Sequence, residues 1–306
     1  MTTTKRTYSP SWRHLTIAVI GGDEREQEIC RLAAESGAVV RAFGFPWPSV
    51  GISGVVLAAD AARALAGANI ALMPIPGIAT DGSLFATSAI IPREPLLREM
   101  AAGAHVILGR ADEGLRQSAN VLGISIHEYE GDHELMLLRA PAIVEGVIKV
   151  LIENTQITIH GARICVIGHG NIGAVLTRTL IALGAHVTVC ARNPVQRASA
   201  YTLSAAPLPL DRLSEEAGSF DVLISTAPAA VVTPSLIDRM RPDALIIDVT
   251  APPGSCDLTY ATTTGRKALW ARALGRRAPI TVGASQWWGI ARIIDGILAK
   301  GTINES

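Results

Sequence analysis

Ala162-Arg-Ile-Cys-Val-Ile-Gly-His-Gly-Asn-Ile-Gly173 is the stretch around which the rest of this chain is organised. Its apolar beginning, 163–167, predicts a short buried strand, and three glycines follow at once with G-x-G-x-x-G spacing. Helical spacing over 174–183 and a second apolar strand over 186–190 complete one βαβ unit of the expected length, about 30 residues. Strand, glycines, helix and strand in this order are typical of a dinucleotide-binding domain.

Each glycine of this loop has a physical task. Gly168 makes the tight turn, Gly170 lets a pyrophosphate approach the backbone, and Gly173 lets the helix pack closely on the strand. The N-terminus of the helix offers N–H groups and the positive end of its dipole to the phosphates. The alternative is a tight strand–helix turn that holds no ligand. We expect cofactor contacts from the whole loop, namely Gly168, His169, Gly170, Asn171, Ile172 and Gly173.

The end of the second strand selects between NAD and NADP. An NAD enzyme usually carries Asp or Glu there, about 20 residues past the glycines, to bind the ribose 2′-hydroxyl. This chain has Ala191, Arg192 and Asn193 instead, with no carboxylate. Arg192 can pair with a 2′-phosphate through charge-assisted hydrogen bonds, so we favour NADP over NAD. The alternative for Arg192 is a solvated surface arginine.

The chain beyond this point continues the same domain. A strand over 222–224 is followed by Thr226, Ala227 and Pro228, and in Rossmann oxidoreductases this loop runs beside the nicotinamide ribose, so we expect cofactor contacts here. Later strands are predicted over 245–249, 268–270 and 280–282. An apolar helix over 285–298 carries Trp287 and Trp288, and we expect it to pack back on the first domain or on another subunit.

Composition limits the class of protein. The chain has 306 residues, enough for two domains, with 49% hydrophobic and only 4% aromatic residues, as in layered α/β proteins. Lys plus Arg and Asp plus Glu number 27 each, so no overall charge attracts nucleic acid or an anionic membrane. The four cysteines are far apart in sequence, which favours buried thiols over disulfides or a metal site. A secretory signal and long apolar runs are absent, and we expect a cytoplasmic protein.

The first half of the chain predicts a second Rossmann-like domain. Strands and helices alternate from 15 to 128, which indicates a parallel sheet. Its first turn, Gly21-Gly22-Asp23-Glu24, has an incomplete glycine pattern, and Glu24 and Glu26 would repel a pyrophosphate. This domain therefore serves the substrate. We predict an α/β fold of two Rossmann-like doubly wound parallel-sheet domains separated by a cleft, with a loose arm over 1–13, a substrate-side domain over 14–140, an NADP-binding domain over 141–284 and a C-terminal helix over 285–306.

Two further polar features follow from this organisation. Thr80 and Ser83 lie in the loop after a strand over 70–73, and ligands of open α/β sheets bind at such carboxyl ends. The alternative is a polar connecting loop. A long helix is predicted over 132–154 with a break near Pro141, and Glu145 lies in its apolar run, either on the solvent face or directed into the cleft.

Several motifs resemble the family of dipicolinate synthase A subunits. They are Ile17-Ala-Val-Ile-Gly-Gly-Asp23, the Val144-Glu145-Gly146 triplet, Thr158-Ile-His-Gly161, the cofactor glycines, and Asp248 with the Pro253-Gly254 turn. The resemblance spans nearly the whole chain. It implies an NADP-linked oxidation of a dihydrodipicolinate-type ring to dipicolinate in bacterial spore formation, together with a flavoprotein-like B subunit of the synthase. The sequence departs from the family pattern at Ala251-Pro252, where an arginine is expected, and over 271–279.

The implied reaction asks for particular side chains. A dicarboxylate substrate calls for cations, and Arg25 and Arg110 each follow a predicted strand of the first domain, although both could be ordinary surface charges. Glu145 and His160 are the candidate bases, and His160 could equally be a structural, hydrogen-bonding histidine. We expect a homo-oligomer without a metal. Two alternatives stay open: a 2-hydroxyacid-type dehydrogenase, and a non-catalytic NADP-binding partner subunit.

Overall fold

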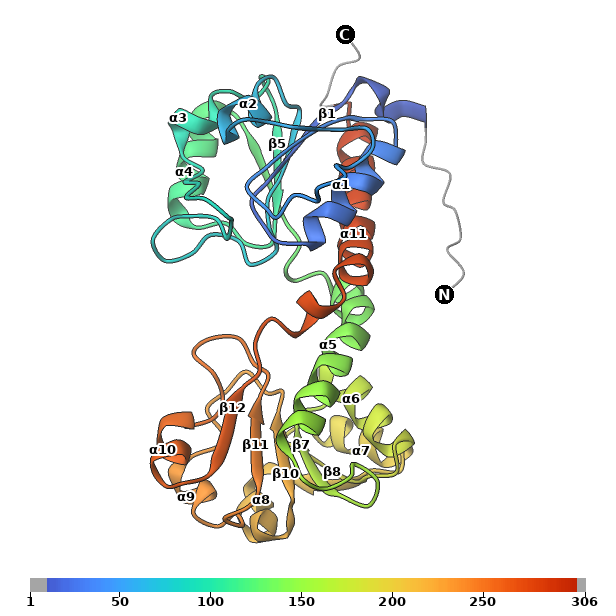
Figure 1. Ribbon diagram of the computed structural model, residues 1–306, viewed down its shortest axis with the longest axis vertical. Helices are drawn as coiled ribbons and strands as arrows, with labels where there is room; N and C mark the ends of the chain where they lie inside the picture. The colour runs from blue at the N-terminus through green and yellow to red at the C-terminus, as the bar shows by residue number, and fades with distance from the viewer. Residues whose placement is uncertain (1–9, 302–306) are drawn as a thin grey trace. The chain divides into compact units, whose positions relative to one another are not determined.

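A computed structural model describes residues 10–301 of the chain (Figure 1). These residues form two compact units, the first made of 10–138 and 278–301 and the second of 139–277. Each unit holds a six-stranded, wholly parallel sheet with helices on both faces. No helix within 10–301 is long and apolar enough to cross a membrane.

The sheet of the first unit is ordered β3-β2-β1-β4-β5-β6. Its strands β4 and β5 are fully buried and, apart from His105, apolar, as expected where helices cover both faces of a parallel sheet. The chain reverses direction across the sheet between β1 and β4, which places the switch point of a doubly wound fold there. The strands are β1 (Thr16–Ile20), β2 (Val39–Phe43), β3 (Val55–Leu57), β4 (Ile70–Leu72), β5 (His105–Leu108) and β6 (Ser125–Glu128).

Two hydrophobic cores lie on the two faces of this sheet. One face packs against α1 (Arg25–Glu35) and α11 (Pro279–Ala299), which lie side by side (Figure 1). The other face is covered by α2 (Ala61–Leu65), α3 (Glu94–Leu97) and α4 (Glu113–Leu122). Trp287 of α11 is fully buried in the first of these cores. The last helix of the chain is therefore part of the first unit, and the predicted strand over 280–282 is wrong because α11 already begins at Pro279.

The N-terminal segment is more ordered than the sequence suggested. Residues 1–9 lie outside the described part of the chain, but Pro10–His14 forms a 3-10 helix. Trp12 is fully buried, meets Trp287 edge-on with ring centroids 5.6 Å apart, and donates from Nε1 to Asp295 at 3.2 Å. The expectation of a loose arm over 1–13 is therefore wrong for its last residues, because the indole ring of Trp12 completes the core.

The second unit repeats the same plan. Its sheet is ordered β12-β11-β10-β7-β8-β9, so both units have the strand order 3-2-1-4-5-6 of a classical dinucleotide-binding fold when strands are counted within the unit. The predicted fold class, two Rossmann-like doubly wound parallel sheets, is confirmed. The strands are β7 (Arg163–Ile167), β8 (His186–Ala191), β9 (Ala206–Pro209), β10 (Val222–Ser225), β11 (Leu245–Asp248) and β12 (Lys267–Trp270).

The helices of the second unit cover both faces of its sheet. One core gathers the second half of α5 (His133–Asn154) with α6 (Asn171–Ala182) and α7 (Pro194–Thr202). The other gathers α8 (Leu213–Glu216), α9 (Pro234–Ile237) and α10 (Leu258–Thr263). Helix α5 runs without interruption for 22 residues with Pro141 inside it, so the predicted break at that proline does not occur. Short 3-10 turns lie at Leu210–Arg212, Ala217–Ser219 and Leu274–Arg277.

Candidate cofactor and substrate sites

The glycine loop of the second unit has the geometry of a phosphate site. Gly168 turns the chain with φ +91° directly after β7, and Gly170 is the N-cap of α6, where no side chain caps the helix. A Cβ on Gly173 would collide with the Gly168 carbonyl oxygen, and one on Gly168 would lie 2.8 Å from Thr226 Oγ1. A Cβ on Gly170 would meet no atom within 4 Å. Two glycines therefore allow close packing, and the third leaves open space beside a helix N-terminus, which fits a dinucleotide pyrophosphate.

The loop after β10 is fastened to the glycine loop. Thr226 Oγ1 donates to the carbonyl oxygens of Ile167 at 2.9 Å and Gly168 at 3.3 Å, and the Thr226 N–H also donates to Ile167 at 2.8 Å. Ala227 is half-buried and Pro228 exposed just beyond this anchor. The threonine thus holds the segment predicted to line the nicotinamide ribose in a set position against the phosphate loop.

His169 is the unusual residue of the glycine loop. Its side chain is buried, and neither ring nitrogen has a hydrogen-bond partner among the described residues. Burial lowers the pKa of His169, so the imidazole is neutral near neutral pH and offers one donor and one acceptor. Asn171 and Ile172 follow, both half-buried, in the first turn of α6.

The end of β8 carries no carboxylate and is shaped by arginines. Ala191 is buried and Arg192 exposed, while Asn193 caps α7 by accepting from the Val195 N–H at 2.8 Å. Arg197 Nη1 donates to the carbonyl oxygens of Ala191 and Arg192, both at 2.7 Å, and so shapes the turn that presents Arg192. Sequence reasoning missed Arg197, although its place in the first turns of the helix after the strand was the available signal.

A buried aspartate organises the loop after β11. Asp248 accepts from the Thr250 N–H at 2.9 Å and hydroxyl at 2.7 Å, and from the N–H groups of Ser255 at 2.6 Å and Cys256 at 2.9 Å. Burial alone would raise the pKa of Asp248, but these hydrogen bonds outweigh it and hold the pKa below its ordinary value. The charged carboxylate therefore pins both ends of the 249–256 loop to the carboxyl edge of the sheet.

The corresponding turn of the first unit is filled by its own side chain. The Glu26 carboxyl group lies where a Cβ on Gly22 would stand, and it accepts from the Asp23 N–H at 2.7 Å. Burial raises the pKa of Glu26 to about 7. An anionic phosphate would have to displace this carboxyl group. The turn therefore does not fit a dinucleotide, in agreement with its incomplete glycine pattern.

The predicted substrate residues follow three strands of the first unit. Arg25 follows β1; it is buried, and its Nε and Nη2 donate to Asp23 at 2.7 and 2.9 Å. Burial lowers its pKa, but the Asp23 carboxylate outweighs that effect, so Arg25 stays charged. It is therefore not an ordinary surface charge. Thr80 and Ser83 follow β4, and Ser83 Oγ donates to Asp81 at 2.6 Å. Arg110 follows β5; its side chain is exposed, and its Nε lies 3.8 Å from Glu130 Oε2.

The two predicted bases lie on exposed parts of the second unit. Glu145 is exposed on α5 and forms an ion pair with Arg277. The His160 ring lies over Gly184, just before β8, and the His160 carbonyl accepts from Thr158 Oγ1 at 2.9 Å. His160 thus precedes β7, whereas the glycine loop follows it, and a strand of five residues is about 17 Å long. This position favours the structural interpretation of His160 over proton transfer beside the nicotinamide.

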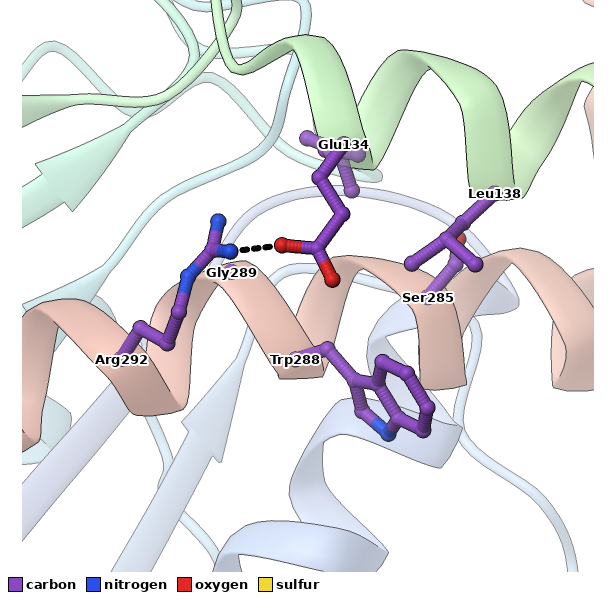
Figure 2. Close-up of a pocket in the computed structure, with 7 residues that line it drawn as sticks. Glu134, Leu138, Ser285, Trp288, Gly289 and Arg292 are labelled. Atoms are coloured by element: carbon purple, nitrogen blue, oxygen red, sulfur yellow. Dashed lines mark hydrogen bonds and ion pairs between the residues drawn. The ribbon is translucent and has the colours of Figure 1, made fainter.

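A small cavity in the first unit lies between α11 and the start of α5 (Figure 2). Its volume is about 60 Å³, and Arg292 forms ion pairs there with Glu134 and Asp132. This space is close to that of two water molecules, too small for a dinucleotide or a pyridine dicarboxylate. The lining residues are Glu134, Leu135, Leu138, Ser285, Trp288, Gly289 and Arg292. Within residues 10–301, no group of three or more His, Cys, Asp or Glu side chains could hold a metal ion.

The fold and the open glycine loop together define a two-unit protein of the nicotinamide-nucleotide dehydrogenase type. Residues 148–272 match the alanine dehydrogenase/PNT C-terminal domain, and residues 16–130 match the N-terminal domain of the dipicolinate synthase A subunit. The A subunit of dipicolinate synthase from Bacillus subtilis is 30% identical over 291 residues, which cover 94% of this chain and 96% of that protein. The chain belongs to the family of dipicolinate synthase A subunits.

Solved structures agree with this assignment. The dipicolinate synthase A subunit from Bacillus halodurans superposes with a TM-score of 0.83 at 27% identity, covering 92% of this chain and 97% of that one. Its counterpart from Bacillus subtilis gives 0.83 at 28% identity, with 94% and 98% covered. A transhydrogenase from Sinorhizobium meliloti, at 14% identity and a TM-score of 0.69, covers 92% and 94% and shares the fold alone.

Proposed function

We propose that this protein is an NADP-dependent dehydrogenase that oxidises a dihydrodipicolinate-type ring to dipicolinate, working with a flavoprotein-like B subunit of the synthase. One observation carries the cofactor part of the proposal: Gly170 opens onto free space at the N-terminus of α6, in the place where a pyrophosphate binds. Family membership supports the substrate and the partner, since relatives are named as the A subunit of dipicolinate synthase.

The choice of NADP is supported by the end of β8. Arg192 is exposed there and held by a turn that Arg197 braces, and no residue of 191–193 is a carboxylate. A ribose 2′-phosphate would gain a charge-assisted hydrogen bond from Arg192, whereas the 2′-hydroxyl of NAD would lack its usual acceptor. Bound NADP⁺ supplies the acceptor for the hydride that leaves a ring carbon.

The chain must hold two carboxylates and accept one proton. Arg25, Thr80, Ser83 and Arg110 are our candidates for the carboxylates, because each follows a strand of the first unit at its carboxyl end. Arg25 is a buried cation that is already paired with Asp23, while Arg110 is exposed and forms an ion pair with Glu130 at 3.8 Å. Glu145 is the leading candidate base, ahead of His160, which precedes β7 and so lies at the other end of that strand from the glycine loop. Glu145 must part from Arg277 to take a proton.

Turnover by the purified chain tests the proposal. The chain is incubated with a dihydrodipicolinate-type substrate and NADP⁺ or NAD⁺, with and without the B subunit, and reduced nucleotide and dipicolinate are both measured. We expect the two products in equal amounts, with NADP⁺ preferred. Oxidation of simple 2-hydroxy acids would instead support a 2-hydroxyacid-type dehydrogenase. Tight NADP binding without turnover in any combination would identify this protein as a non-catalytic partner.

A further inference from the structure

Arg272 is held in an unusual way at the carboxyl edge of the second unit. Its guanidinium carbon lies 4.9 Å from the centroid of the Trp270 ring, at the end of β12. The Trp270 indole is itself fixed, since Nε1 donates to the Thr250 carbonyl at 2.9 Å. Its ring edge passes 3.7 Å from the place where a Cβ on Gly254 would stand. Arg272 therefore lies over a ring that is hydrogen-bonded to the loop organised by Asp248.

The Arg272 guanidinium has no carboxylate partner in the part of the chain that the structure describes. Within residues 10–301, Arg272 forms no ion pair, although Arg277 nearby in sequence pairs with Glu145 and Arg241 pairs with Asp221 and Asp243. Stacking on an indole leaves the in-plane N–H groups of an arginine available for a carboxylate. Arg272 is thus an exposed cation that lies over an indole ring and forms no ion pair among the described residues.

The position of Arg272 relates it to the nicotinamide half of the cofactor. The strand order β12-β11-β10-β7-β8-β9 places Arg192, after β8, on one side of the glycine loop and Arg272, after β12, on the other. If Arg192 takes the adenosine ribose, the nicotinamide half extends over the ends of β10 and β11, toward β12. Three strand spacings separate β12 from β7, about 14 Å.

We propose that Arg272, positioned by Trp270, binds a carboxylate of the substrate beside the nicotinamide. The inference rests on the proposed function and extends it, since it names a substrate-binding residue of the cofactor unit itself. Arg272 would then orient one of the two carboxylates of the ring. Trp270 is a positioning residue because it acts only through Arg272.

Binding of pyridine-2,6-dicarboxylate to the full chain, saturated with NADP⁺ and followed by calorimetry, tests the assignment. Replacing Arg272 by Met should weaken dicarboxylate binding by about tenfold or more, since a charged hydrogen bond is lost. The Kd of NADP⁺ should stay within about twofold. Arg272→Lys should recover part of the loss, because the charge returns without the planar fork. Arg239→Met is the matched control: Arg239 is exposed in the same unit but precedes β11, at the opposite edge of the sheet.

The indole is tested separately. Trp270→Ala should weaken dicarboxylate binding while Arg272 is intact, and Trp270→Phe, which keeps an aromatic face, should recover most of it. Equal dicarboxylate affinity in the wild type and Arg272→Met would overturn the assignment and leave the proposed function standing. A wild-type chain that binds NADP⁺ but no dicarboxylate would overturn both. Unchanged melting temperatures of the variants identify these outcomes as effects on binding.

Discussion

The carboxyl group of Glu26 lies against Gly22, in the space that a β-carbon on that glycine would need. The first unit thus keeps the turn of a dinucleotide fold but fills its phosphate position with its own acidic side chain. In the second unit, the space beside Gly170, at the N-terminus of α6, is open. The two units therefore share one strand order but differ at this turn, where the Glu26 side chain fills the first and the space beside Gly170 in the second stays open.

Replacing Glu26 by Gln should change how stability depends on pH. Burial raises the pKa of Glu26 from 4.5 to about 7, so between these values the folded state holds a proton that the unfolded state has lost. The free energy of unfolding therefore falls as pH rises through this window. The Glu26→Gln variant does not titrate and so keeps its stability as pH rises. Above pH 7 its free energy of unfolding should exceed that of the wild type by up to about 3 kcal/mol. Urea unfolding from pH 4 to 8 measures the free energies of unfolding of the wild type and of Glu26→Gln, and Glu99→Gln, at an exposed position, is the control. A difference in stability between Glu26→Gln and the wild type that stays constant with pH would contradict the prediction.

Two alanine substitutions in the glycine loop should separate binding from folding. The added methyl group of Gly170→Ala would meet no atom within 4 Å, and the backbone φ of −87° suits alanine, so the melting temperature should be unchanged. The same methyl group should block the pyrophosphate and abolish nucleotide binding. Gly173→Ala collides with the Gly168 carbonyl and should destabilise the fold itself. Thermal unfolding and nucleotide titration of both variants check this. Normal NADP affinity in Gly170→Ala would place the phosphates elsewhere.

Arg192 should determine the preference between the two nucleotides. Arg192→Ala should weaken NADP binding by about 1–3 kcal/mol, the value of a hydrogen bond to a charged group, and leave NAD binding almost unchanged. Calorimetric titration with each nucleotide measures both. Exposed Arg178, on α6 in the same unit, gives the control Arg178→Ala. Equal affinities for NADP and NAD before and after the substitution would end the claim.

The two adjacent tryptophans of α11 should differ sharply in their contribution to stability. Trp287 is fully buried against Trp12, whereas Trp288 is 46% exposed at the rim of the small cavity (Figure 2). Trp287→Ala should cost about 3–5 kcal/mol, because it leaves a large cavity in the core. Trp288→Ala should cost clearly less. Denaturant unfolding of both variants provides the comparison, and similar losses would show that the core assignment of α11 is wrong.

Arg110 should act on the substrate and not on the nucleotide. It follows β5 in the first unit, with 72% of its side chain exposed, and Arg110→Met should raise the substrate KM while the Kd of NADP stays the same. Arg98→Met is a suitable control, since its side chain is 62% exposed but it belongs to the turn before β5. Steady-state kinetics with both variants compare an arginine after β5, at the carboxyl ends of the strands, with one before β5, at their amino ends. Unaltered turnover in Arg110→Met would remove it from the substrate site.

Local sequence patterns were sufficient to predict the fold class and the tight turn of the glycine loop between β7 and α6. A buried strand needs a run of apolar residues, and a tight turn beside a phosphate needs glycine at set positions, as at Gly168 and Gly170. The absence of a carboxylate beside Arg192 is equally a local fact. Such patterns failed where a distant partner decides the outcome. Trp12 looked like part of a loose arm because Trp287, its partner in the core, is 275 residues further along the chain.

Folding, by contrast, determines which charges are free and which are engaged. Sequence reasoning treated Arg25 and Arg110 alike, but the folded chain buries Arg25 on Asp23 and leaves Arg110 exposed. It left His160 open between a base and a structural histidine, and the length of β7 separates this histidine from the glycine loop. The hydrogen bond from the Trp270 indole to Thr250 joins the end of β12 to the 249–256 loop, 20 residues earlier in the chain. Such contacts depend on the order of strands in the sheet, which short-range patterns do not encode.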